Sequence, residues 1–173
     1  TLIPTATCHR YSRIVRVLVT GSAGQLGTDV VLACAAAGDQ VIGLSRADLD
    51  ISDLGAVRRV VDEVRPDAII NCAAWTAVDD CEADPERADR INHQGVGYLA
   101  EASAAVGAHL VQVSTDYVFD GTKSSAYTES DTPNPQSVYG ASKLAGERAA
   151  GPDATVVRTS WVCSAHGGNM VAT

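Results

Sequence analysis

The feature that most constrains the fold is an apolar run that ends in a glycine-rich turn. Residues 14–20 are mostly aliphatic and β-branched and are followed by Gly21, which predicts a buried strand that ends in a tight turn. Residues 25–37 then predict a helix that ends at Gly38. A buried strand, a glycine turn and a helix in direct succession are typical of α/β proteins.

The same alternation of strands and helices continues along the chain. Further strands are predicted at residues 40–44, 67–71, 109–113 and 155–159, and further helices at residues 53–64, 85–106 and 137–150. Ser52 or Asp53 is a suitable N-cap for the second helix. This pattern predicts an α/β fold, a Rossmann-like doubly wound parallel sheet with helices on both faces. Ligands of such sheets bind at the carboxyl ends of the strands, where the strand order reverses.

The composition excludes several classes of protein. Hydrophobic residues make up 46% and charged residues 20% of the chain, which is ordinary for a soluble globular domain. The formal net charge of −8 repels nucleic acid and anionic membranes, so neither is an expected partner. No apolar run approaches the roughly 18 residues that are needed to span a bilayer.

The cysteines and histidines indicate neither disulfides nor a metal site. The five cysteines are Cys8, Cys34, Cys72, Cys81 and Cys163, and none of them forms a C-x-x-C pair. An odd number of scattered cysteines favours reduced thiols in a cytoplasmic protein. The histidines do not cluster in the sequence, so we expect no metal.

The glycine-rich turn is the first candidate binding site. Gly21, Gly24 and Gly27 allow the backbone to turn tightly, to approach a pyrophosphate and to pack closely against the helix. The helix that starts with Gln25 and Leu26 directs backbone N–H groups and the positive end of its dipole toward such a phosphate. An ordinary glycine-rich strand–helix turn would look the same in isolation, and the context of the motif favours dinucleotide binding.

Two further loops follow predicted strands and would lie beside the same ligand. Arg46 precedes several acidic residues after the second strand, an order that favours the 2′-phosphate of NADPH over the ribose hydroxyls of NADH. A solvated surface charge explains Arg46 nearly as well. After the third strand, the small residues Ala73 and Ala74 before Trp75 would let the backbone pass close to a cofactor. A tight strand–helix loop without a ligand would use the same residues.

Tyr139 and Lys143 form the candidate catalytic pair. In the predicted helix they lie one turn apart on the same face. A free Tyr has a pKa near ~10, and a neighbouring ammonium would lower that pKa toward the range that suits proton transfer. Thr115, next to Ser114 after the fourth predicted strand, offers a hydroxyl to a reacting carbonyl. A lone Y-x-x-x-K is common by chance, so the ordered set of motifs carries the prediction of hydride transfer with a coupled proton.

Several longer motifs carry a family resemblance. They are Ser-Thr-Asp-Tyr-Val-Phe-Asp-Gly at residues 114–121, Val-Tyr-Gly-Ala-Ser-Lys-Leu-Ala-Gly-Glu at 138–147 and Arg-Thr-Ser-Trp-Val at 158–162. Gly-Gln-Leu-Gly at 24–27 and Thr-Ala-Val-Asp at 76–79 agree with them. Together with the glycine motif, this set resembles the extended short-chain dehydrogenases/reductases, and among them the dTDP-4-dehydrorhamnose reductases.

The resemblance implies that NADPH or NADH reduces the 4-keto group of dTDP-4-dehydro-L-rhamnose to give dTDP-L-rhamnose, a precursor of cell-wall polysaccharides. Tyr139 would then be the proton donor, and Lys143 would bind the nicotinamide ribose and tune Tyr139. Thr115 would polarise the substrate carbonyl. Tyr117 and Thr76 would contact the nucleotide-sugar substrate.

The resemblance extends to a few other positions, and the sequence departs from the family pattern at two. Asp50 and Ile51 would lie by the adenine. Asn92 matches a helix asparagine that the family has near its active site, although a polar helix residue is a strong alternative explanation. Trp75 and Cys163 stand where the family usually has Tyr. The first change should be tolerated, whereas the second would alter a contact with substrate or cofactor.

The family's chains are much longer than this one. We expect residues 1–13 to be an unstructured leader, and residues 14–173 to be an NAD(P)-binding domain that stops before the C-terminal substrate-binding part, in the lead-in to another helix. The full-length protein would form a homodimer. Two alternatives stay open: a non-catalytic regulatory protein that binds the cofactor on the same scaffold, and an inactive truncated reductase with an exposed sheet edge.

Overall fold

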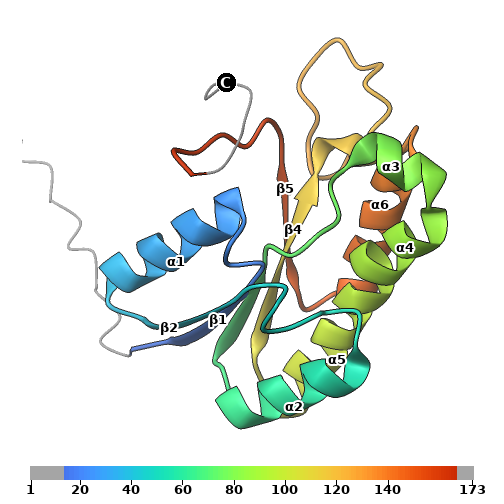
Figure 1. The fold of residues 1–173 in the computed structure, drawn as a ribbon. Helices are drawn as coiled ribbons and strands as arrows, with labels where there is room; N and C mark the ends of the chain where they lie inside the picture. Colours follow the sequence, from blue (N-terminus) through green and yellow to red (C-terminus); the bar gives the residue numbers. More distant parts are fainter. Residues whose placement is uncertain (1–13, 167–173) are drawn as a thin grey trace, which may run out of the picture.

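Five parallel strands form a single sheet in the computed structural model, which describes residues 14–166 (Figure 1). The strands are β1 (Arg16–Thr20), β2 (Gln40–Leu44), β3 (Ala68–Asn71), β4 (His109–Thr115) and β5 (Thr155–Thr159). Their order in the sheet is β2-β1-β3-β4-β5. The chain therefore reverses its direction of travel across the sheet between β1 and β3, and that reversal opens a crevice at the carboxyl ends of the strands.

Helices connect all consecutive strands and cover the two faces unequally. The helical segments are α1 (Gln25–Ala37), α2 (Leu54–Val64), α3 (Val78–Ala83), α4 (Pro85–Asp89), a π-helical turn (Arg90–Gln94), α5 (Gly95–Val106), a 3₁₀ turn (Asp116–Val118) and α6 (Val138–Ala150). Of these segments, α1 lies on one face of the sheet, and α2, α5 and α6 pack side by side on the other (Figure 1). Right-handed crossovers produce this division, because only the β1–β2 connection runs in the opposite direction.

Most predicted elements are confirmed to within two residues. Helix α1 ends at Gly38, which adopts the left-handed conformation with a φ of 91°. Asp53 caps α2, because its side chain accepts a hydrogen bond from the backbone N–H of Ala56. The predicted helix over residues 85–106 is continuous but contains the π-helical turn, and α3 was not predicted. The expected leader and the expected lead-in to another helix lie outside the described residues.

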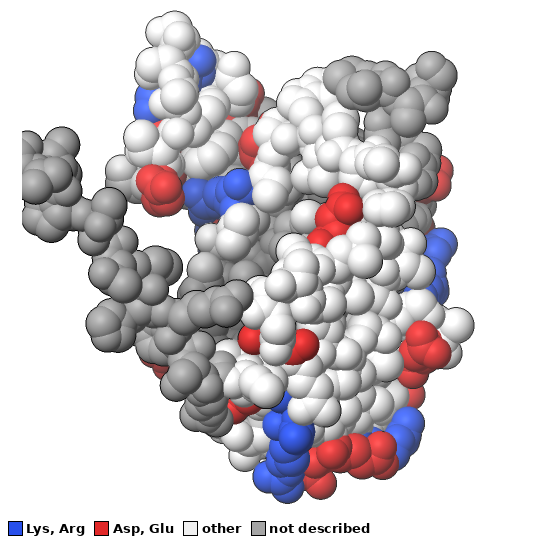
Figure 2. Space-filling view, turned by 90° about the vertical axis from the view of Figure 1, so that its left-hand side faces the viewer, with Lys and Arg blue, Asp and Glu red and all other residues white. Residues whose placement is uncertain are grey.

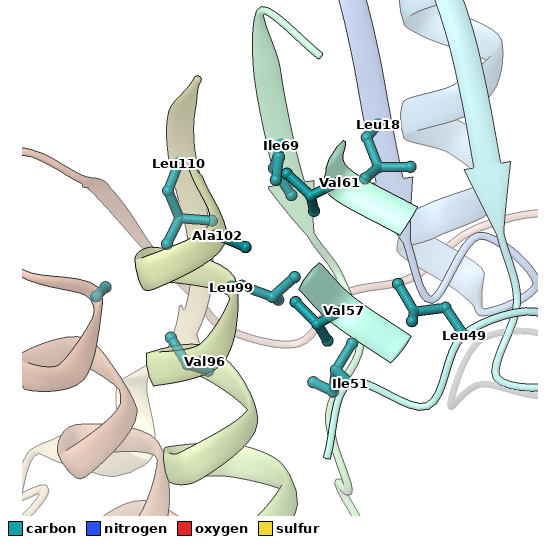
Figure 3. Packing of buried hydrophobic residues seen from close by; sticks show 11 residues of the cluster. Leu18, Leu49, Ile51, Val57, Val61, Ile69, Val96, Leu99, Ala102 and Leu110 are labelled. Carbon is teal, nitrogen blue, oxygen red and sulfur yellow. The ribbon is translucent and has the colours of Figure 1, made fainter. Parts of the chain in front are cut away.

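The main hydrophobic core lies between the sheet and the face that carries α2, α5 and α6. Leu18 and Ile69 project from β1 and β3 toward Val57, Val61 and Leu99 of the helices (Figure 3). Burial of each such side chain stabilises the fold by about 1.5–3 kcal/mol. This core fixes the strands rigidly against one another, so the loops at their carboxyl ends start from fixed positions.

Strand β5 forms one edge of the sheet within the described residues. Its Val156 and Val157 side chains are 37% and 41% exposed, as expected for a sheet whose fifth strand is not covered. Charged residues of both signs gather at the lower end of the face in Figure 2, and most of the surface above them is uncharged. In the part of the chain that the structure describes, no helix has the length and apolar character of a membrane-spanning helix.

Candidate active site

The glycine-rich turn after β1 is packed so tightly that side chains would not fit. Gly21 has a φ of 68°, and a Cβ atom on it would lie 2.6 Å from the backbone nitrogen of Ala73. A Cβ atom on Gly27 would lie 2.2 Å from the carbonyl oxygen of Gly21. Helix α1 therefore begins directly against the turn. Its N-cap residue, Gly24, has no side chain to bond the first N–H groups, which leaves this end suited to an anion.

Two neighbouring cavities lie along the carboxyl ends of the strands and share Gly24, Cys72 and Ala74 in their walls. Predicted site residues that line the first cavity, of about 530 Å³, are Gly24, Gln25, Leu26, Gly27, Ala74, Thr76, Thr115, Tyr117, Tyr139 and Lys143. Those that line the second, of about 360 Å³, are Gly21, Gly24, Arg46, Asp50, Ile51, Ala73, Ala74 and Trp75. The fold thus brings every one of these residues to one continuous hollow, with the glycine turn at its middle.

Helix α6 directs both members of the candidate catalytic pair into the first cavity. Ser137 caps the helix by accepting a hydrogen bond from the N–H of Gly140. A Cβ atom on Gly140 would lie 2.3 Å from the carbonyl oxygen of Tyr117, so the first turn packs directly on the 116–118 segment. Tyr139 and Lys143 are only 7% and 4% exposed, and both line the cavity from the same helical face.

Tyr139 is held in its protonated form. Burial raises its pKa above the ordinary value, and a hydrogen bond with the side chain of Thr115 offsets only part of that increase. The direction is opposite to the lowering expected from a neighbouring ammonium, because burial is the largest cause of the pKa shift and Lys143 is not among its causes. The Lys143 Nζ donates instead to the carbonyl oxygen of Val113, at 2.7 Å. A protonated phenol is the form that a proton donor requires.

Lys143 is a buried cation with one hydrogen bond to the protein backbone. Burial lowers its pKa to about 8, while the negative charge of Glu147 and the thiol of Cys72 act in the opposite direction. Burial in turn raises the pKa of Cys72 to about 11, so the thiol beside the ammonium is protonated at neutral pH. At neutral pH Lys143 is therefore mostly charged and is the buried positive group of the first cavity.

Two residues with hydroxyl groups at the end of β4, Ser114 and Thr115, also line this cavity. Thr115 Oγ1 accepts a hydrogen bond from the N–H of Tyr117 at 3.2 Å and donates to Asp116 at 3.1 Å. The hydroxyl of Ser114 is buried and has no hydrogen-bond partner among the described residues. A buried hydroxyl without a partner is costly, so Ser114 is suited to a polar group that enters the cavity.

Asn92 does not line either cavity but holds the backbone of Trp75, which lines the second cavity. It is buried in the π-helical turn and bonds the Trp75 backbone on both sides, through Oδ1 to the N–H at 2.8 Å and through Nδ2 to the carbonyl at 3.0 Å. Its Nδ2 also donates to Ser142 Oγ of α6. Asn92 therefore ties the loop after β3 to α6, the helix that carries the candidate catalytic pair. π-Helical turns are frequent at functional sites.

The second cavity carries the residues expected to distinguish the two nicotinamide nucleotides. Arg46 and Asp50 are both exposed at its wall. Hydrogen bonds from Ser52 lower the pKa of Asp50, so this carboxylate is charged and already engaged. The guanidinium of Arg87 lies 4.3 Å from the centre of the Trp75 ring, which holds the ring at the rim of this cavity.

Sequence reasoning missed the segment after β5. Thr159, the last residue of β5, and Ser160, Trp161 and Val162 after it all line the first cavity. Their position directly after a strand could have identified them, because parallel strands end at the same edge. Cys163, which was expected to alter a contact in the site, is exposed and does not line the cavity. Residues 14–166 contain no cluster of three or more metal-ligating side chains.

Comparisons with known proteins agree with this geometry. The profile of a family described as the RmlD substrate binding domain matches residues 15–173. A dTDP-4-dehydrorhamnose reductase of Streptomyces griseus is 47% identical over 161 residues, which cover 91% of this chain and 53% of the relative. A protein of the same name from Burkholderia thailandensis is 44% identical and covers 92% and 54%. The chain therefore spans about half the length of the curated relatives that it matches.

Solved structures give the same result. The crystal structure of dTDP-4-dehydrorhamnose reductase from Bacillus anthracis in complex with NADP is 40% identical in sequence and superposes with a TM-score of 0.89. The match covers 92% of this chain and 58% of that one. A related structure from Clostridium acetobutylicum is 43% identical, has a TM-score of 0.87, and is matched over 90% of this chain and 56% of its own.

Proposed function

Because the chain belongs to the family of the RmlD substrate binding domain, we propose that it binds a nicotinamide nucleotide and supplies the reacting side chains of a sugar ketoreductase. The substrate of the proposed reaction is dTDP-4-dehydro-L-rhamnose, and the product is dTDP-L-rhamnose. The names of the relatives support this substrate, and the NADP complex of the Bacillus anthracis protein supports the cofactor. The observation that carries the proposal is that Thr115, Tyr139 and Lys143 meet in one cavity against the glycine turn.

The residues present fit a dinucleotide. Gly21 and Gly24 line the cavities with bare backbone, and the start of α1 offers N–H groups to the charge of a pyrophosphate. The buried Ser114 hydroxyl offers a hydrogen bond that no described residue uses. Arg46 at the wall of the second cavity supplies a positive group for a 2′-phosphate, which favours NADPH over NADH.

Reduction of a ketone needs a hydride at carbon and a proton at oxygen. When bound, the reduced nicotinamide supplies the hydride. Thr115 Oγ1 would bind the carbonyl oxygen by turning its O–H from Asp116 to the substrate, and Tyr139 would donate its phenolic proton to the same oxygen, which gives the alcohol. The ammonium of Lys143, anchored at Val113, would hold the ribose of the nucleotide through its remaining N–H groups, and its charge would favour loss of the proton from Tyr139.

The experiment that tests this function measures oxidation of NADPH by the chain with dTDP-4-dehydro-L-rhamnose, generated in place by the epimerase that makes it. We expect turnover by the wild type and a loss of at least ~100-fold in kcat for Tyr139→Phe, because general acid catalysis contributes about that much. Tyr98→Phe, on α5 and outside both cavities, should keep wild-type turnover.

Two results would overturn the proposal in different ways. Tight binding of NADPH without any turnover would favour a regulatory protein on the same scaffold. Absence of cofactor binding, together with a weak near-UV circular dichroism signal, would favour an inactive truncated reductase.

Further parts of the proposal concern location and partners. We propose a cytoplasmic protein, supported by its free cysteines: in the described residues, Cys34, Cys72, Cys81 and Cys163 form no disulfide. The nucleotide sugar is the proposed small-molecule partner. A homodimer of the full-length protein, and the absence of nucleic-acid and membrane partners, remain predictions from the sequence.

A further inference from the structure

A chain of buried hydrogen bonds crosses the sheet below the two cavities. The Thr20 hydroxyl donates to Oδ1 of Asn71 at 2.6 Å, and Nδ2 of Asn71 donates to Oε1 of Gln112 at 2.7 Å. These three residues are register neighbours on β1, β3 and β4, and each is at most 1% exposed. The Gln112 Nε2 donates to the Val113 carbonyl at 2.6 Å, the same oxygen that binds the ammonium of Lys143.

The direction of every bond in this chain is fixed. The backbone N–H of Ala73 donates to Oδ1 of Asn71 at 3.1 Å, and a backbone N–H cannot exchange its role for that of an acceptor. Oδ1 of Asn71 must therefore face Ala73, which leaves only its Nδ2 for Gln112. Oε1 of Gln112 must accept that bond, so its N–H group is the one that faces Val113.

Two donors therefore converge on the carbonyl oxygen of Val113. The amide of Gln112 and the ammonium of Lys143 together occupy its two lone pairs. The positive end of the amide N–H dipole lies beside the cation, which disfavours the charged form of Lys143. An amide turned the other way would present an oxygen and would favour that form.

We propose that Asn71 and Gln112 are positioning residues that fix the Lys143 ammonium and hold an N–H donor, rather than an acceptor, beside it. The role of this arrangement in a reaction rests on the proposed function. The N–H donor of Gln112 sets how readily the Lys143 ammonium loses a proton, and the ammonium in turn acts on Tyr139. The arrangement itself does not depend on that function, since it is complete within β1, β3, β4 and α6.

Other groups that face Lys143 act independently of this chain of bonds. Glu147 on α6 and Cys72 after β3 both favour its charged form, and burial in the sheet–helix interface opposes them. Tyr139 on α6 and Asp116 in the 3₁₀ turn line the same cavity. The side chains of these four residues make no hydrogen bond to Asn71 or Gln112 in the described structure, so Gln112→Met leaves all four in place. Cys72 follows Asn71 directly in the chain, and Gln112→Met is therefore the primary variant of the test.

The test measures the titration of Lys143 by NMR in the chain with isotope-labelled lysine, without cofactor or substrate. Lys123 and Lys143 are the only lysines, so two signals are expected and Lys123 serves as an internal reference. We expect Gln112→Met to raise the pKa of Lys143 by about half a unit, because it removes the competing donor. Asn71→Leu should raise it as well, because it frees the Gln112 amide to turn its oxygen toward the ammonium.

The control for loss of a buried polar group is Ser103→Ala. Ser103 is 3% exposed, and its hydroxyl donates to the Leu99 carbonyl within α5, away from this chain of bonds. It should leave the Lys143 titration unchanged. An unchanged or lowered pKa of Lys143 in a folded Gln112→Met or Asn71→Leu variant would overturn the inference. Because no cofactor is present, that result would not bear on whether the protein is a reductase.

Discussion

Lys143 carries a charge in one of the most buried positions of the structure. Its side chain is surrounded by the sheet and by α6, and its pKa is lowered to about 8 from the ordinary value for lysine. A lowered pKa means that the folded state holds the proton less tightly than the unfolded state. Stability therefore rises with pH between about 8 and 10.5, and the free-energy cost of burying the ammonium is fully present below about pH 8.

This penalty predicts that replacing Lys143 stabilises the protein. Lys143→Met should raise the free energy of unfolding at pH 7 by about 1–3 kcal/mol, because the buried charge is removed while the aliphatic volume stays. Urea denaturation at pH 7 and at pH 10 measures the effect, and the gain should shrink at the higher pH. The matched control is Lys123→Met, since Lys123 pairs with Asp131 near the surface and should show no gain. A lower free energy of unfolding for Lys143→Met would show that the cost of burying the charge is smaller than the stabilisation from the bonds that Lys143 makes.

Individual residues differ in how far the sequence could predict them. Spacing alone placed Tyr139 and Lys143 on one helical face, because the helical repeat dictates it. The raised pKa of Tyr139 could not be predicted, because burial depends on how α6 packs against the 116–118 turn. The bond between Asn71 and Gln112 required the strand order, which places residues 41 positions apart side by side.

Of the contacts between helices and strands, the one between α6 and the π-helical turn does most to set the geometry of the site. A Cβ atom on Gly146 of α6 would lie 2.1 Å from the carbonyl oxygen of Asn92. The two segments therefore approach as closely as backbones can. This approach brings Asn92 to both Ser142 and the Trp75 loop, and so joins the loop after β3 to α6.

Gly146→Ala should destabilise the fold by about 1–3 kcal/mol or more, because the added methyl group must push α6 away from the π-helical turn. Gly97→Ala on α5 is the matched control. A Cβ atom there meets nothing closer than the Ala149 Cβ at 3.7 Å, so it should be neutral or stabilise by up to about 1 kcal/mol. Thermal unfolding of both variants measures the difference. Equal changes in the unfolding temperature for the two variants would show that α6 and the π-helical turn are not in close backbone contact at Gly146.

The regular elements were predictable because local signals mark their ends. Gly38 and Asp53 fix the end of α1 and the start of α2 through their own backbone and side-chain bonds. The π-helical turn was not predictable, since its register follows from bonds that Asn92 makes to residues 17 and 50 positions away. Helix α3 is only six residues long and lacks an N-cap side-chain bond, so its sequence carries little signal.

At the scale of the whole molecule, a strongly acidic chain is proposed to bind an anionic cofactor. The formal net charge is −8, and the cavities offset it locally with the start of α1, the buried Lys143 ammonium and Arg46 at the second wall. The fold achieves this because strand order brings all the carboxyl-end loops to one edge of the sheet. The sequence predicted that edge as the site, since alternating strands and helices allow few other arrangements.

An NMR titration of the labelled chain with NADPH, read at each backbone amide, tests whether the dinucleotide binds at the carboxyl ends of the strands. We predict that the largest shifts fall at Gly21, Gly24 and Gly27 and at the start of α6, with changes near Arg46 that NADH does not reproduce. Shifts confined to α2 and α5, or no saturable shift at millimolar NADPH, would contradict a dinucleotide site at the carboxyl edge of the sheet.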